Sequence, residues 1–211
     1  TLPVDAMCEA VREACPDALT AIDGVSIAGA VDVRIDQIRP DYYFWSLQKD
    51  FALPAMGSVA IVSDRAVETA RSVPNRGYAL DLVEWADRAA DLQTPMTVPD
   101  LALRCLIARL KEMRDEGPAR FSRHRELAQM QRAWAVRHAS GVLASPGFAS
   151  PPVTAILLPQ GITGPAFTKA ARSLLNVQLS SGYGRTKEAA FRIAAMGHTR
   201  VEDMARVLEG L

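Results

Sequence analysis

The stretch DGVSIAGAVDVRIDQIRPDYYFWSLQK, residues 23–49, decides how we interpret this chain. It starts with Asp23 at the end of an apolar run, residues 18–23, and it contains a second run, residues 42–46, that is rich in aromatic side chains. Both runs have the composition of buried strands. Lys49 comes just after the second run. Because ligands bind at strand ends in α/β sheets, we expect Asp23 and Lys49 to lie in one site.

The segments around this stretch alternate between strand and helix patterns. This alternation predicts an α/β protein with a mostly parallel sheet. A pair of long helices, 100–117 and 118–141, follows the predicted sheet, and we expect the domain change near residue 117, with a large domain in 1–117 and a smaller α/β domain in 118–211. Five other helices are expected: 3–15, one that Asp64 caps, one that ends near residue 90, 164–175 and one that begins at Val201. The other expected strands are 57–63, 153–158, 177–181 and 191–194.

Composition excludes several classes of function. The chain of 211 residues carries 24 basic and 24 acidic residues, and its formal net charge is zero. Neither nucleic-acid binding nor a polybasic membrane contact is indicated, and the apolar runs are too short to span a bilayer. No signal peptide is visible. The chain begins with Thr1 and not with Met, so we expect it to be a piece of a longer protein.

The three cysteines, Cys8, Cys15 and Cys105, lack the spacing of metal ligands, and we expect no metal site. An odd number of cysteines without a CxxC motif fits a reducing cytoplasm better than a disulfide framework. Cys8 and Cys15 are seven residues apart on a predicted helix, so we expect both to be small core residues.

An acid and a lysine at strand ends suit one cofactor in particular. A carboxylate beside a heteroaromatic nitrogen favours the protonated ring. A partly desolvated lysine attacks carbonyl groups and forms a covalent link with an aldehyde. Pyridoxal phosphate (PLP) needs both partners. From these residues alone, Asp23 can equally be a helix cap and Lys49 a solvated loop residue.

Further motifs follow in a fixed order: VPNRGYALDL at 73–82, QTPMTVP at 93–99, EGPARFSRHRELA at 116–128 and SGYGRTKEAAFRIAAMGH at 181–198. With DGVS and SLQK, they resemble the class V aminotransferases of fold type I over essentially the whole chain. The resemblance is closest to the branch of the phosphoserine aminotransferases and the alanine–glyoxylate or serine–pyruvate aminotransferases. It implies the C-terminal portion of such an enzyme, with a partial PLP-binding domain and a small C-terminal domain.

The resemblance also implies roles for single residues around the cofactor. Lys49 would hold PLP covalently and move the proton between the substrate and the cofactor. Asp23 would pair with the ring nitrogen, Val25 would lie against one face of the ring, and Gln48 would contact the cofactor. The phosphate loop and the stacking aromatic residue of the family belong to an N-terminal half that this sequence lacks, so we expect a partial site.

Two more residues are implied in substrate binding and assembly. Arg192 matches the arginine that binds the substrate α-carboxylate, and its planar fork suits a carboxylate better than a lysine does. Thr97 matches a threonine that reaches the cofactor phosphate of the neighbouring subunit. The resemblance therefore implies a homodimer with shared sites that transfers an amino group between a small amino acid (phosphoserine, serine or alanine) and a 2-oxo acid, as in serine biosynthesis. The cysteine content adds the expectation that this enzyme is cytoplasmic.

Two other interpretations stay open. A cysteine desulfurase-like lyase of the same fold would need a mobile loop cysteine, and none of the three cysteines is well placed for this. A truncated, non-catalytic partner chain would fit the missing half. The roles of residues 75–77 and of His198 also stay open, whereas we expect His124 and His138 to be surface residues of a long helix.

Overall fold

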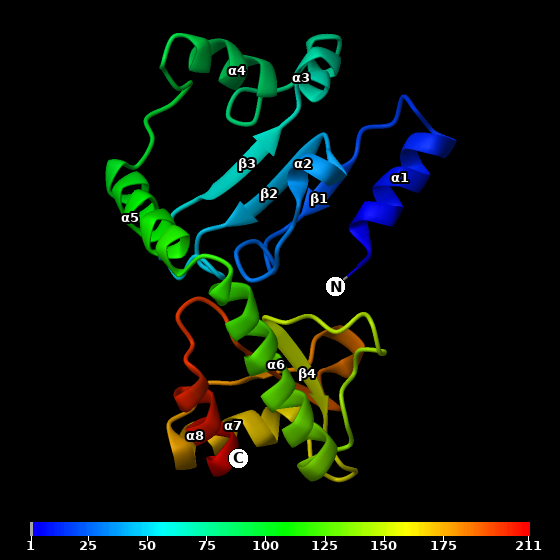
Figure 1. Cartoon of the computed structure of the whole chain (residues 1–211), viewed down its shortest axis with the longest axis vertical. Helices are drawn as coiled ribbons and strands as arrows, with labels where there is room; N and C mark the ends of the chain where they lie inside the picture. Colours follow the sequence, from blue (N-terminus) through cyan, green and yellow to red (C-terminus); the bar gives the residue numbers. More distant parts are fainter. Residues whose placement is uncertain (1) are drawn as a thin grey trace.

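The computed structural model describes residues 2–211 and arranges them around two small sheets (Figure 1). The first half contains α1 (Val4–Ala14), β1 (Ala21–Asp23), α2 (Ile35–Ile38), β2 (Tyr42–Ser46), β3 (Ser58–Val62), α3 (Asp64–Arg71) and α4 (Leu82–Ala90). Two long helices follow, α5 (Asp100–Glu116) and α6 (Ala119–His138). The last part contains β4 (Val153–Leu157), α7 (Gly164–Leu175), β5 (Ser180–Ser181), a 3₁₀ turn η1 (Gly184–Thr186), β6 (Ala190–Ala194) and α8 (Val201–Gly210).

The first sheet has the order β1-β2-β3. β1 and β2 are parallel, with Asp23 opposite Phe44, whereas β2 and β3 are antiparallel, with Tyr42 opposite Val62. The prediction of a mostly parallel sheet therefore holds for one of these two pairs only. A parallel return needs a crossover of a dozen or more residues, usually a helix. Residues 47–57 between β2 and β3 contain turns and no helix, so the chain can only fold back antiparallel.

Side chains of α1, α2, the first sheet and the segments that connect them form one buried cluster: Cys8, Ile22, Ala28, Ile38, Tyr43 and Phe51. Trp45 packs against this cluster and stacks on Phe51, with ring centroids 5.6 Å apart. Cys15 was expected in this core together with Cys8, and that prediction is wrong. Cys15 is the residue that ends α1 and is exposed, so it no longer shares the buried helix face.

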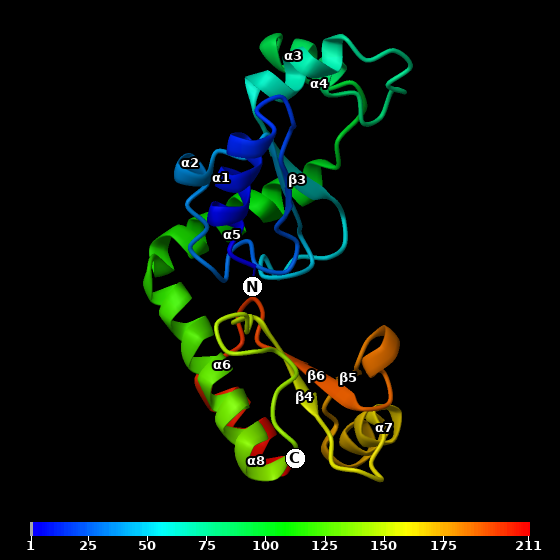
Figure 2. The same cartoon turned by 90° about the vertical axis from the view of Figure 1, so that its right-hand side faces the viewer.

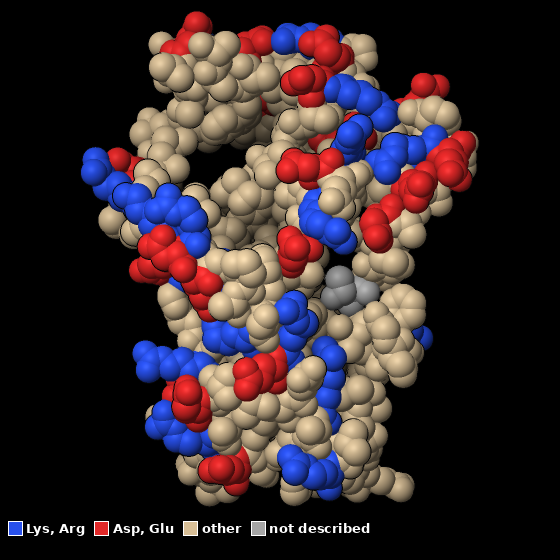
Figure 3. Space-filling view, viewed as in Figure 1, with Lys and Arg blue, Asp and Glu red and all other residues tan. Residues whose placement is uncertain are grey.

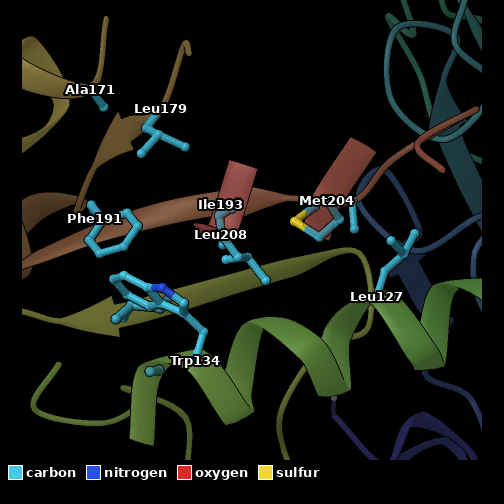
Figure 4. Close-up of a cluster of buried hydrophobic side chains, with 11 residues drawn as sticks. Leu127, Trp134, Ala171, Leu179, Phe191, Ile193, Met204 and Leu208 are labelled. Atoms are coloured by element: carbon cyan, nitrogen blue, oxygen red, sulfur yellow. The ribbon is translucent and has the colours of Figure 1, made fainter. Parts of the chain in front are cut away.

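The second sheet, β4-β6-β5, is antiparallel throughout and has β6 at its centre. Trp134 of α6 meets Phe191 of β6 edge to face, with ring centroids 6.1 Å apart (Figure 4). The buried face of α6 begins in the first turn of the helix and includes Arg120, His124, Leu127, Ala128, Gln131, Trp134 and Ala135. His124 is 0% exposed, so the expectation of a surface histidine is wrong.

The two long helices are separated by Gly117, which has a φ of +57° and whose N–H bonds to Met113 O. α5 and α6 meet at an angle there (Figure 2). One buried cluster uses residues from Val4 to Met113, and the other uses residues from Leu127 to Leu211. We therefore propose that the chain divides into two domains near residue 117.

Two local expectations concern helix starts and the surface. The helix α3 was expected to be capped by Asp64, but Ser63 is the cap, because its Oγ accepts the N–H of Ala66 at 3.1 Å. Charged side chains of both signs are interspersed over the face shown in Figure 3. None of the helices within residues 2–211 is long and apolar enough to cross a membrane.

Candidate active site

The parallel pairing of β1 and β2 brings Asp23 and Lys49 to the same edge of the first sheet. Asp23 is the last residue of β1, and Lys49 follows the last residue of β2, Ser46, by three positions. Asp23 is exposed, and its Oδ1 accepts the N–H of Val25 at 2.8 Å. That bond turns the backbone after β1, leaves Val25 half-buried, and leaves the second carboxylate oxygen, Oδ2, free for another partner.

Residues 47–52 form a tight segment that we call the lysine turn. The Ala52 N–H bonds to Lys49 O at 2.9 Å, and the Leu53 N–H bonds to Leu47 O at 3.0 Å. Leu47 is buried, Gln48 is exposed and Lys49 is half-buried. The Lys49 ammonium has no hydrogen bond or ion pair with any other residue of 2–211. An amine that is partly shielded and not engaged fits the covalent partner of an aldehyde cofactor.

Tyr43 supports the loop that follows Asp23, a role that the sequence did not indicate. Its ring and hydroxyl lie so close to Gly24 that any side chain at residue 24 would collide with them. Burial, and then the nearby charge of Asp23, raise the pKa of Tyr43 to about 12. Tyr43 therefore stays a neutral phenol, and Gly24 is needed for close packing at this point.

Asp50, the residue after Lys49, is a second feature that the sequence did not indicate. It is 0% exposed, and its Oδ1 accepts the N–H of Gly197 at 3.3 Å. Burial raises the pKa of Asp50 to about 6, although Gly197 and the charges of Arg120, Arg123 and Arg109 oppose this shift. Across from it, burial and Arg123 lower the pKa of His124 to about 4.

We expect an Asp50→Asn variant to become more stable relative to the native protein as the pH rises from about 4 to about 6. In this range the folded native protein still holds a proton on Asp50 that the unfolded chain has released, because the pKa rises from 3.8 to about 6 on folding. The native protein thus loses stability with rising pH, and asparagine does not titrate. The difference should reach roughly 3 kcal/mol.

Urea unfolding of both proteins at several pH values would measure this difference. Asp17→Asn is the matched control, because Asp17 is exposed and this substitution makes the same chemical change outside the core. If the free energies of unfolding of the native protein and of Asp50→Asn changed in parallel from pH 4 to pH 7, the raised pKa of Asp50 would be contradicted.

Arg192 lies on the central strand of the second sheet, opposite Ala155 of β4 and Ser180 of β5. It is half-buried, its Nε donates to Ser181 O at 3.0 Å, and its Cζ lies 6.0 Å from the centre of the Tyr183 ring. The two terminal nitrogens of the guanidinium have no hydrogen-bond partner within residues 2–211. A guanidinium held at Nε with both terminal nitrogens free is suited to a carboxylate.

Thr97 is exposed in the loop of residues 91–99, between α4 and α5. Thr94 Oγ1 donates to Met96 O at 2.7 Å, and the Tyr78 hydroxyl donates to Pro95 O, so the start of the loop is tied down. No hydrogen bond within residues 2–211 uses the Thr97 hydroxyl. Thr97 therefore makes no hydrogen bond to the segments that carry Asp23 and Lys49, and its hydroxyl is free to bind a group from outside residues 2–211.

The two open questions about residues 75–77 and His198 receive partial answers. Arg76 is used within its own loop, where its Nε bonds to Asp81 Oδ1 and its Nη1 to Val73 O, both at 2.8 Å. His198 is exposed, and its Nε2 lies 2.6 Å from Arg109 Nη1 and 3.4 Å from Glu112 Oε2. Arg76 therefore has a structural role, and His198 lies at the junction of the two halves.

Comparisons with known proteins identify aminotransferases among the relatives of this chain. No family model matches the chain. It is 30% identical to a serine–glyoxylate aminotransferase of Methylorubrum extorquens over 93% of this chain and 51% of that protein. The pyridoxamine–pyruvate aminotransferase structure from Mesorhizobium loti matches with a TM-score of 0.87 and 30% identity, over 99% of this chain and 55% of that one. The relatives and structural neighbours that the chain matches include class V aminotransferases of fold type I.

The chain is also 30% identical to a protein of Synechococcus sp. named as the small subunit of a soluble hydrogenase, over 92% of this chain and 50% of that protein. The chain spans about half the length of the curated relatives it matches. Class V aminotransferases depend on PLP. The unengaged lysine amine, the strand-end carboxylate of Asp23 and the free fork of Arg192 fit that cofactor and an amino-acid substrate.

Proposed function

We propose that the protein containing this chain is a PLP-dependent aminotransferase that moves an amino group between a small amino acid and a 2-oxo acid. The observation that carries this proposal is the parallel β1–β2 pair, which places Asp23 and an unengaged Lys49 at one sheet edge. When bound, PLP supplies an electron-withdrawing ring that stabilises negative charge on the substrate α-carbon.

The residues of this chain would divide the remaining work. Asp23 keeps a proton on the ring nitrogen, because an adjacent carboxylate favours the charged ring. Val25, β-branched and therefore stiff, offers a flat apolar surface to one ring face, and Gln48 contacts the cofactor beside the lysine. Lys49 anchors the cofactor and carries the proton to and from the α-carbon. Arg192 holds the substrate carboxylate, so that the Cα–H bond points at Lys49.

The names of the relatives support small substrates. One is called a serine–glyoxylate aminotransferase and another a pyridoxamine–pyruvate aminotransferase. We propose serine, alanine or phosphoserine as amino donor and glyoxylate or pyruvate as acceptor. Phosphoserine would place the enzyme in serine biosynthesis, and kcat/KM values for the three donors would identify the preferred one.

The test is to incubate the full-length protein with PLP and follow the visible absorbance of the bound cofactor and the appearance of amino-acid product. We expect borohydride to reduce the link and fix the cofactor to the protein, and we expect amino-group transfer from at least one of these donors. A protein that bound no PLP, or bound it and transferred no amino group, would overturn the proposal. The sulfur-releasing alternative has its own readout, sulfide from cysteine.

We further propose a homodimer with shared sites, in which Thr97 binds the cofactor phosphate of the neighbouring subunit. The proline-stiffened, exposed loop of residues 91–99 and the unengaged Thr97 hydroxyl support this arrangement. Replacing Thr97 with valine should weaken PLP binding roughly ten- to a hundredfold, because a bond to a charged group contributes about 1.5–3 kcal/mol.

Mixed dimers would separate the two possible arrangements. A Lys49→Ala subunit keeps Thr97, and a Thr97→Val subunit keeps Lys49, so shared sites would give one intact site in each mixed dimer. Recovery of tight PLP binding after mixing is therefore expected. No recovery, or a fully active monomer, would mean that Thr97 serves its own subunit or no cofactor.

We also propose a cytoplasmic location. All three cysteines are free, including Cys15 at the surface, which suits a reducing compartment. Fractionation of cells with an antibody against the protein would test this, and recovery in a secreted or membrane fraction would contradict it.

A further inference from the structure

We propose that Asp50 is a positioning residue, which fixes Lys49 relative to the strand that carries Arg192. This inference rests on the proposed function, since it concerns the distance between the amine that holds the cofactor and the guanidinium that holds the substrate. It assigns a role to a buried acid that touches neither.

The first observation is a direct bond between the two halves of the chain. The side chain of Asp50 is fully buried, and its Oδ1 accepts the N–H of Gly197, a residue 147 positions further along. Asp50 belongs to the lysine turn, and Gly197 follows β6. A displacement of either segment therefore breaks this bond, and buried polar groups are costly to leave without partners.

The second observation is how closely the two segments approach. Gly197 has a φ of +62°, and a methyl group there would lie 2.7 Å from the Cβ of Ala52, the last residue of the lysine turn. Arg109 Nε donates to Phe51 O at 3.1 Å, and Arg123 Nη1 donates to Gly197 O at 3.1 Å. Arginines from α5 and α6 thus hold the carbonyl groups on both sides of the contact.

The third observation is the imidazole that lies between Asp50 and the end of β6. His124 Nδ1 lies 2.7 Å from Ala195 O. A carbonyl oxygen only accepts, so Nδ1 carries the hydrogen. The other nitrogen, Nε2, then faces Asp50 Oδ1 at 3.8 Å. His124 therefore fixes the backbone three residues after Arg192, a stretch of about 10 Å along an extended strand.

These contacts make a continuous path from Lys49 through Asp50 to the strand of Arg192. Proton transfer at the α-carbon depends on the mutual geometry of the amine and the held substrate, and misplacement by about 1 Å can cost a hundredfold in rate. Loss of Asp50 should therefore act on turnover of bound substrate more than on cofactor attachment.

The test is a double-variant comparison in the full-length protein with PLP bound. We expect Asp50→Ala to lower kcat/KM roughly tenfold, mostly through kcat, while the borohydride-reducible link to the cofactor is retained. Asp50→Asn should restore most of the activity, because its amide oxygen still accepts the Gly197 N–H. Asp17→Ala, an exposed aspartate, is the matched control and should leave the kinetics unchanged.

Combining Asp50→Ala with Arg192→Lys gives the decisive measurement. If Asp50 works through the placement of Lys49 relative to Arg192, the two losses overlap, and the double variant loses less than the product of the single losses. Losses that multiply would overturn the proposal, and so would an Asp50→Ala enzyme with normal kcat. If Asp50→Ala does not fold, Asp50→Ser serves in the same comparison.

A second readout needs no cofactor. In the cofactor-free protein, Asp50→Ala should speed hydrogen exchange at the Gly197 amide and in residues 51–53, and Asp50→Asn should not. Unchanged exchange would overturn the proposed link. A native protein that fails to transaminate would instead overturn the proposed function, so the two failures are distinguishable.

Discussion

Replacing Lys49 with alanine is expected to abolish both the covalent attachment of PLP and transamination. The Lys49 amine is the one placed at the carboxyl edge of the parallel pair with Asp23, and it has no other partner within residues 2–211. Without it, nothing links the cofactor to the protein, and no base stands beside the α-carbon. Loss of the general base alone should lower kcat roughly a hundred- to ten-thousandfold, and loss of the covalent link adds to this effect.

Borohydride reduction followed by mass analysis of the peptides would measure the attachment. Lys111→Ala is the matched control, because Lys111 is exposed on α5. The control should keep the label and the activity. A Lys49→Ala protein that still carried a reducible link to PLP would show that another lysine holds the cofactor.

Arg192→Lys should lower kcat/KM roughly ten- to a hundredfold and leave PLP affinity nearly unchanged. Lysine keeps the charge but cannot form the pair of hydrogen bonds that the guanidinium makes, and the loss of one such bond to a charged partner costs about 1.5–3 kcal/mol. The structure gives a further reason. Arg192 Nε is fixed by Ser181 O, and a lysine has no group to use this anchor while it holds the substrate.

Steady-state kinetics beside a PLP titration would separate substrate from cofactor effects. Arg185→Lys is the control, since Arg185 is exposed in η1, close to Arg192 in sequence. Normal kinetics in Arg192→Lys, or an equal loss of PLP and substrate affinity, would mean that Arg192 is structural and that the carboxylate is held elsewhere.

Sequence patterns predicted those helices and strands whose ends are set by the residues of the segment itself. The aromatic run gave β2 with its ends at 42 and 46, and Gly164 to Leu175 gave α7. The short helix α2 was not predicted, since four residues are too few to show a helical period. The β2–β3 pairing was also not predicted, because strand direction depends on the connection rather than on the strands.

The candidate site divides in the same way. Asp23 and Lys49 were singled out because one ends a strand pattern and the other follows one, and the family resemblance then implied their roles, which stay predictions. Their shared edge results from one parallel pairing. Asp50 was missed, since its partner lies 147 residues away and nothing near Lys49 indicates burial. The burial of His124 could have been predicted from spacing. Residues 124, 128, 131 and 135 recur every three or four positions and form one buried helix face, but the polar side chains at 124 and 131 made this face hard to recognise.

The two halves approach each other closely at Gly197 and Ala52 because glycine has no Cβ. A methyl group at residue 197 would have to move away from Ala52 by roughly 1 Å to reach an ordinary carbon–carbon separation. We therefore expect the combined size of residues 52 and 197 to set the spacing between the lysine turn and the strand of Arg192. Engineering for longer or shorter substrates can begin with this pair, neither member of which is assigned a contact with the substrate.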